Sequence, residues 1–219
     1  MKGEASDYDR RWEAYLAATV KETVARIQVH PGERVLDVGC GTGRLLARLA
    51  GDGGEVSGGA GDGHRDGGGP TGDPTRARFL TGVDLNAGML AVARRRLPPT
   101  TRLVQARAGA LPFAKESFDL AVSSSSLHFW SRPREGLAEI ARVLRPGGRL
   151  VVTDWCRDFW IQALRELYMG RIDPTHHRTY TMAELREMLE AAGFRSVSLE
   201  RYRALATWGM MTARAVKDR

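Results

Sequence analysis

The chain has 219 residues, of which 42% are hydrophobic and 27% are charged, a composition typical of a globular protein of one domain. No run of about 18 apolar residues occurs, which excludes a membrane-spanning helix, and the charged segment from Met1 to Arg11 lacks the apolar core of a secretion signal. Two cysteines, Cys40 and Cys156, are too few for a disulfide framework and favour a cytoplasmic location. The net charge of +7 fits an anionic partner or, more simply, an arginine-rich surface.

The spacing of apolar residues predicts alternating helices and strands. Helices are expected over about 7–29, 43–50, 87–97, 133–144, 158–169 and 181–192, and strands over about 34–38, 79–84, 101–105, 118–123, 149–154, 195–201 and 207–216. Strands separated by helices predict a doubly wound, mainly parallel sheet of seven strands that is covered on both faces. The last two strands have no helix between them, so we expect an antiparallel hairpin at one edge.

One segment, residues 51–76, does not fit this alternation. It contains eleven glycines, and Val56 is its only aliphatic residue larger than alanine. Such a composition buries too little apolar surface to offset the entropy of ordering the chain. A phosphate-binding loop is the functional alternative, but no Lys-Ser/Thr pair follows. We therefore expect a single domain over 1–219, with an N-terminal helical lid over 1–30 and a flexible insertion over 51–76.

The most informative stretch is Arg34–Leu46, RVLDVGCGTGRLL. A buried strand is followed by three glycines in alternate positions and then by apolar residues at helical spacing. A strand, a glycine turn and a helix N-terminus together form a nucleotide-type binding site. Dinucleotide-binding folds use G-x-G-x-x-G, which would need a glycine where Arg44 stands. The pattern here is instead D-x-G-x-G-x-G, starting at Asp37.

An acidic residue is expected about 20 residues beyond such a turn, where it binds ribose hydroxyls. Asp84 lies 45 residues after Gly39, and without the 26 residues of the insertion the separation is 19. Capping of the following helix is the structural alternative for Asp84, but Asn86 can serve as the cap instead. Met89, one turn further along, fits either an adenine contact or core packing.

Further motifs lie downstream: Ala108-Gly109-Ala110-Leu111-Pro112-Phe113, Phe118-Asp119 and Leu144-Arg145-Pro146-Gly147-Gly148. With the glycine turn and Asp84, they make the chain, from about Tyr8 to Lys217 apart from the insertion, resemble the class I S-adenosylmethionine-dependent methyltransferases. The branch it resembles is that of the ubiquinone/menaquinone-biosynthesis-like (type 11) enzymes. The resemblance implies a Rossmann-like fold with S-adenosyl-L-methionine as methyl donor. It implies cofactor contacts from Asp37, Gly39, Cys40, Gly41, Gly43, Asp84, Leu85, Met89, Ala108, Gly109, Ala110 and Ser124.

The chain departs from this family at one position. Arg107 stands where the family has an acid that accepts a hydrogen bond from the adenine amino group, and Ala106 replaces the preceding glycine. Arginine has no acceptor. Either adenine is held by the backbone near Ala108 and by apolar walls, or the Arg107 side chain points outward.

Two segments carry candidate catalytic residues. The stretch Ser123–Trp130 resembles the family's segment beneath the methionine part of the cofactor, and His128 within it fits either a base or a structural histidine. The stretch Asp173–Tyr180 holds His176, His177, Arg178 and Tyr180 close together, with a plain polar loop as the alternative. We select His128, His177 and Tyr180 as catalytic candidates. No third metal ligand at suitable spacing accompanies the His-His pair, so no metal is expected.

The sequence therefore predicts methyl transfer, by in-line displacement, to a small-molecule acceptor bound beneath the N-terminal helix and the 155–180 region. Tyr8, Arg11 and Trp12 are candidate lid residues. Nucleic acid is not expected as acceptor, because the motifs of base methyltransferases are missing. The alternatives are a non-catalytic S-adenosylmethionine-binding or scaffold protein and an NAD-dependent oxidoreductase. The sequence leaves open the acceptor, the methylated atom and the oligomeric state.

Overall fold

The computed structural model describes residues 4–51, 79–172 and 175–218. The expected insertion over 51–76 lies outside the described residues except for Gly51. In chain order the elements are α1 (Glu4–Arg11), α2 (Glu13–Val24), β1 (Arg34–Val38), α3 (Arg44–Ala50), β2 (Phe79–Asp84), α4 (Ala87–Arg96), β3 (Arg102–Gln105), β4 (Phe118–Ser124), the 3₁₀ turn η1 (Leu127–Phe129), α5 (Pro133–Val143), β5 (Leu144–Trp155), α6 (Trp160–Ile172), α7 (Met182–Ala191), β6 (Phe194–Leu205) and β7 (Trp208–Lys217).

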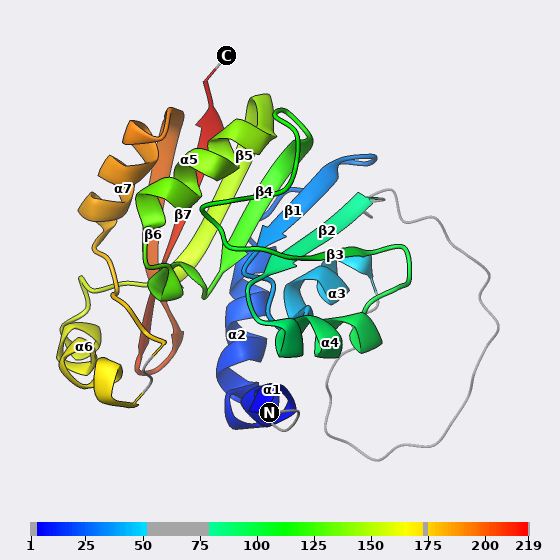
Figure 1. Cartoon of the computed structure of the whole chain (residues 1–219). Coiled ribbons are helices and arrows are strands. Elements are labelled where there is room, and N and C mark those ends of the chain that lie inside the picture. Colours follow the sequence, from blue (N-terminus) through cyan, green and yellow to red (C-terminus); the bar gives the residue numbers. More distant parts are fainter. Residues whose placement is uncertain (1–3, 52–78, 173–174, 219) are drawn as a thin grey trace.

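The seven strands form one sheet in the order β3-β2-β1-β4-β5-β7-β6 (Figure 1). The first five in this order pair in parallel, whereas β7 pairs antiparallel with both β5 and β6. This confirms the predicted Rossmann-like, doubly wound sheet with an antiparallel C-terminal hairpin. The carboxyl ends of the parallel strands therefore meet at one edge, which is where ligands bind in this architecture.

Apolar side chains on the two faces of the sheet form two separate cores. Alternate residues of β1 point to opposite sides: Leu36 packs with α5 and α7, and Val35 with α3 and α4. Leu137 and Ile140 of α5 are fully buried on the first side, as is Leu46 of α3 on the second. The result is a sheet with helices on both faces, which leaves its carboxyl edge as the place for a site (Figure 1).

The N-terminal region differs from its prediction. A single helix was expected over 7–29, but two helices form, with Trp12 between them outside helical geometry (φ −109°, ψ 15°). The break turns the Trp12 ring against Tyr15 and Trp208, at centroid distances of 6.1 and 5.9 Å. Tertiary packing of one aromatic ring therefore outweighs local helix propensity here.

Two details concern the second half of the chain. The predicted start of α7 is confirmed, since Thr181 and Glu184 form a complete capping box. Strand β5 begins at Leu144 and not at 149, because Leu144 pairs with Phe118 before the register shifts.

Candidate active site

The glycine turn lies at the carboxyl end of β1, between β2 and β4. The N–H groups of Gly39 and Cys40 both donate to the Val83 carbonyl, at 2.8 and 2.9 Å. A side chain at Gly39 is impossible, because φ is +80° and a Cβ would lie 2.4 Å from the Ser126 side chain. Gly41, with φ +53°, has nothing within 4 Å of a built Cβ. The turn is thus held in place at Gly39 and Cys40, whereas at Gly41 it faces open space.

Asp84 ends β2 beside this turn. One carboxylate oxygen accepts from the Gly41 N–H at 2.8 Å and the other from the Asn86 N–H at 2.8 Å. Asn86 caps α4, since its side chain accepts from the N–H groups of Gly88 and Met89. The cap is therefore Asn86 and not Asp84, as the sequence allowed. Burial raises the pKa of Asp84, although the backbone hydrogen bonds oppose the rise. An ionised carboxylate has about four acceptor positions, so two remain for a ligand.

Asp37, in β1, is a second carboxylate at the same edge. Its side chain is 1% exposed, and its Oδ1 atom has no hydrogen-bond partner among the described residues. Burial is the main cause that raises the pKa of Asp37 to about 8, and the nearby negative charge of Asp84 is the second cause. A buried carboxyl group without a partner is costly, so this arrangement favours a ligand that supplies a donor or a positive charge.

Both carboxylates and the turn line a cavity of about 850 Å³. This volume suits a nucleoside-sized ligand together with a small second molecule. Of the predicted cofactor residues, those that line it are Asp37, Gly39, Cys40, Gly41, Asp84, Leu85, Met89, Ala108, Gly109 and Ser124. Gly43 and Ala110 lie outside the lining. Gly43 faces α4, where a Cβ would lie 2.8 Å from Leu97, and Ala110 donates its N–H to the Arg107 carbonyl at 3.0 Å.

The opposite wall of the cavity includes residues that the sequence reasoning missed. Leu16, Thr19 and Val20 of α2 line it, with Ser125 and Phe129 after β4. Ser125 has φ +52°, a strained conformation for a residue other than glycine, and its hydroxyl lies 2.6 Å from the Tyr15 hydroxyl. The serine run after β4 was the available signal, but nothing local identifies which serine turns inward.

The N-terminal helices are held over the cavity by an ion-pair network around Asp9. This buried carboxylate accepts from Thr42 Oγ1 at 2.7 Å and from Arg96 at 2.6 Å, and it pairs with Arg44 at 3.2 Å. Burial alone would raise its pKa, but the hydrogen bonds from Arg96 and Thr42 hold the pKa of Asp9 below its ordinary value. The network connects α1 directly to the glycine turn.

Of the predicted lid residues, Tyr8 lines the cavity. Trp12 packs with Tyr15 and Trp208, and Arg11 is exposed beside the Trp12 ring, 5.7 Å from its centroid.

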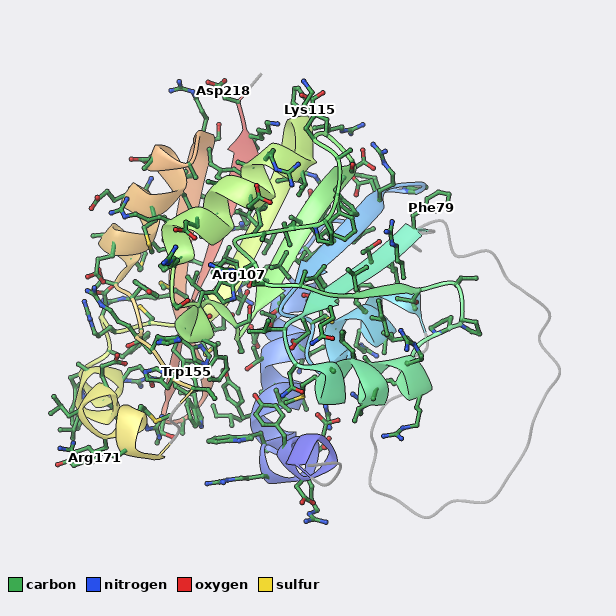
Figure 2. All side chains as sticks on the ribbon, in the orientation of Figure 1. Phe79, Arg107, Lys115, Trp155, Arg171 and Asp218 are labelled. Atoms are coloured by element: carbon green, nitrogen blue, oxygen red, sulfur yellow. The ribbon has the colours of Figure 1, made fainter. Side chains whose placement is uncertain are left out.

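Arg107 is among the residues that line the cavity, and its half-exposed side chain pairs with Glu135 at 3.5 Å. The preceding residue, Ala106, donates its N–H to the Asp84 carbonyl at 3.1 Å. Of the two alternatives, the structure favours the one in which Arg107 points outward. The next two residues, Ala108 and Gly109, also line the cavity, and Figure 2 shows the position of Arg107.

His128 forms a buried pair with Asp154 at the end of β5. Its Nδ1 lies 2.6 Å from an Asp154 oxygen, and both side chains are 2% exposed. The ring stacks on Trp155 at a centroid distance of 4.2 Å. Its Nε2 atom is buried and has no hydrogen-bond partner in the part of the chain that the structure describes. The next two residues, Phe129 and Trp130, line the cavity, whereas His128 is not among the lining residues.

The remaining catalytic candidates follow α6. His177 is exposed, lines the cavity and donates its N–H to the His128 carbonyl at 2.9 Å. Tyr180 lines a neighbouring groove of about 580 Å³ that shares His177, and burial raises the pKa of its hydroxyl. His176 is buried with Nε2 3.2 Å from Glu166, which makes it a structural residue. Among the described residues, no three His, Cys, Asp or Glu side chains gather as a metal site.

Comparisons with known proteins agree with this geometry. Residues 67–152 match the family model described as "Methyltransferase domain". A demethylmenaquinone methyltransferase of Beutenbergia cavernae is 34% identical over 163 residues, which cover 74% of this chain and 55% of that protein. The chain spans about half the length of the first curated relatives that it matches.

Solved structures show the same fold. A Haloferax volcanii protein, solved with the Trm112 methyltransferase activator, aligns with a TM-score of 0.80 and 20% identity, covering 100% of this chain and 97% of that one. A SAM-dependent methyltransferase of Thermotoga maritima aligns with a TM-score of 0.73 and 19% identity, over 99% and 97%. No helix among the described residues is long and apolar enough to cross a membrane.

Proposed function

From the premise that the chain carries a class I S-adenosylmethionine-dependent methyltransferase domain, of the menaquinone-biosynthesis-like branch, we propose that it methylates a small-molecule acceptor. The observation that carries the proposal is the combination of an open glycine turn, Asp84 with two unused acceptor positions and Asp37 without a partner, all in one cavity. We assign the domain to 1–219, with 1–30 as its lid, and a cytoplasmic location.

The residues present fit S-adenosylmethionine. Its two ribose hydroxyls need acceptors, which Asp84 supplies. Its methionine end carries an ammonium group, which would pair with the buried Asp37 carboxylate and lower the pKa of that group. A cationic ligand would thus relieve the unfavourable arrangement of two neighbouring carboxyl groups, one of which has a buried oxygen without a partner among the described residues.

When bound, S-adenosylmethionine supplies a methyl group activated by the positive sulfur, ready for in-line displacement. The protein's part is mostly to position the acceptor and exclude water. Asp37 and the Gly39–Gly41 part of the turn would hold the methionine end, and Ala108 and Gly109 would border adenine. Tyr8, with the α2 residues Leu16 and Val20, closes the cavity over the acceptor.

Acceptors that must lose a proton need a base. His177 is the candidate that faces the cavity directly, and Tyr180 lies in the adjoining groove. His128 is held by Asp154 and stacked on Trp155, and its backbone carbonyl accepts from the His177 N–H at 2.9 Å. We propose His177 and Tyr180 as the catalytic candidates, with His128 as the residue that positions His177.

A labelling screen tests the function. The purified protein is incubated with methyl-labelled S-adenosylmethionine and a metabolite extract, and labelled products are identified by mass spectrometry. A labelled small molecule that is formed by the wild type and not by the Asp84→Ala variant supports the proposal. Label found only on protein or nucleic acid overturns the small-molecule assignment.

A scaffold that binds S-adenosylmethionine without turnover is the second candidate, and Arg107 in place of the family's acid is the observation that favours it. Binding of S-adenosylhomocysteine without any labelled product across extracts would support this candidate. Binding of NADH in its place would point to the oxidoreductase alternative, against which Arg44 already argues.

A further inference from the structure

Helix α6 exposes an apolar face. Trp160, Leu164, Leu167 and Tyr168 are 72, 50, 65 and 56% exposed, at positions i, i+4, i+7 and i+8. This spacing places them on one side of the helix. Large apolar side chains scattered singly on a surface are ordinary, but four on one helical face are not.

The inner face of α6 buries a polar side chain of the kind that normally lies outside. Gln162 is 1% exposed, beside the apolar Met169 at 7%. Glu166, the helix's only acid, is turned toward the following segment, where it accepts from the Thr179 N–H and lies beside His176. The outer face of α6 therefore combines apolar side chains with Arg171 and has no acid among its described residues, while Arg165 is turned toward Thr207 and the Trp208 ring.

Positive charge surrounds this face. Arg171 is exposed near the end of α6. On the neighbouring strand β6, Arg201 and Arg203 are exposed and lie 5.6 and 5.7 Å from the Phe159 ring, which immediately precedes the helix. The nearby acid Asp158 accepts from the Met182 N–H and so faces α7. We call the following exposed residues together the α6 surface: Trp160, Leu164, Leu167, Tyr168, Arg171, Arg201 and Arg203.

The α6 surface lies at the carboxyl edge of the sheet. In Figure 1, α6 stands outside the sheet beside the β6–β7 hairpin. Thr175 and His177, a few residues after α6 in the sequence, line the cavity. Figure 2 shows Arg171 at the outer side of α6, away from Phe79 across the molecule.

We propose that the α6 surface docks the protein on a membrane rich in anionic lipid, with α6 lying in the plane of the interface. Trp and Tyr are the side chains that favour the headgroup region, and leucines between them reach the acyl boundary. Arginines at the rim pair with anionic headgroups. A second copy is a poorer partner, because a twofold contact would bring the arginines of this surface together.

Co-sedimentation with vesicles tests the proposal. Neither cofactor nor acceptor is needed, so failure of binding is distinguishable from failure of methyl transfer. We expect binding to phosphatidylglycerol-rich vesicles and at least tenfold weaker binding to pure phosphatidylcholine. The double variant Leu164→Glu/Leu167→Glu should lose binding, and Arg171→Glu should weaken it about fivefold or more. The control is Phe79→Glu, which places the same charge on another exposed apolar residue far from α6.

Tryptophan fluorescence gives a second readout that does not depend on how well the double variant folds. Vesicles should shift the emission of the wild type to shorter wavelength, and Trp160→Phe should remove most of that shift. Equal binding by wild type and the double variant would overturn the proposal. So would a wild-type dimer in light scattering that the double variant converts to monomer, because a second copy would then cover the surface.

Discussion

Replacing Asp84 tests the cofactor site most directly. In the structure two of the four acceptor positions of its carboxylate are used by Gly41 and Asn86, both at 2.8 Å. The two left would serve the two ribose hydroxyls. Hydrogen bonds to a charged group contribute about 1.5–3 kcal/mol each, so Asp84→Ala should lose about 3–6 kcal/mol of binding. At about 1.4 kcal/mol per factor of ten, affinity falls about 10²–10⁴-fold.

Asp84→Asn should have a smaller effect, because its amide oxygen retains acceptor positions while the charge is lost. We expect a loss of about 10–100-fold, as if one charged hydrogen bond were removed. Titration calorimetry with S-adenosylhomocysteine measures both variants. Thermal unfolding without ligand reports separately how much the turn itself is loosened, since Gly41 loses its partner as well.

Asp119→Asn is the matched control. Like Asp84, Asp119 is a carboxylate that accepts a backbone N–H, here from Arg34 at 2.7 Å, but it is buried at the amino end of β4. Its replacement should lower stability and leave affinity within about twofold. Equal affinity of wild type and Asp84→Ala would refute the ribose assignment, whatever the melting temperatures.

Three further predictions concern neighbouring groups. The pKa of Asp37 is raised from 3.8 to about 8, so between about pH 4 and pH 8 the folded protein retains a proton that the unfolded chain releases. The free energy of unfolding without cofactor should therefore fall by about 1.4 kcal/mol for each pH unit of increase in this range. Asp37→Asn should make the free energy of unfolding less dependent on pH. An unchanged slope in denaturant titrations would contradict it. Asp9→Asn should lower the melting temperature and weaken S-adenosylhomocysteine binding, because it removes the ion pairs that hold the N-terminal helices over the cavity. The control is Asp7→Asn, which removes only the exposed ion pair with Arg10 and should change neither quantity. Identical effects of the two variants would contradict the lid assignment. Arg107→Asp removes the pair with Glu135 that turns this side chain outward, and repulsion from Glu135 would favour a carboxylate directed toward the cavity. It should then tighten binding about three- to tenfold by restoring an acceptor, whereas Arg107→Ala should not. Equal affinities of the two variants would show that adenine does not meet this side chain.

The N-terminal region and α6 show what local patterns do not contain. Apolar spacing predicted the helix at 158–169 and would equally describe a buried face, yet the structure buries Gln162 and exposes Leu164 and Leu167. Periodicity identifies the apolar side of a helix but not whether another element covers it. The Trp12 break has the same origin, since its partner Trp208 comes from the other end of the chain.

Arg107 and His128 were open questions for a related reason. Whether Arg107 reaches the adenine position depends on Glu135, which α5 places beside it. Whether His128 is a core residue or a base depends on Asp154, which is brought to 2.6 Å because β4 and β5 are neighbours in the sheet. The partners in these two pairs are 28 and 26 positions apart in the chain, and they come into contact only because the folded sheet brings their segments together.

The features that the sequence determined by itself are those whose physics is local. The glycine turn after β1, the placement of Asp84 and Asn86 after β2, the start of α7 near Thr181 and the strand–helix alternation all depend on residues within a few positions of one another. The tertiary structure alone decided which distant groups share the cavity. Asp9 joins Thr42 and Arg96 across 33 and 87 residues, and Ser125 meets Tyr15 across 110. Such pairs arise only when the folded sheet brings strand ends and the N-terminal helices to one edge, because side-chain hydrogen bonds and ion pairs act over a few ångströms in space and not along the chain.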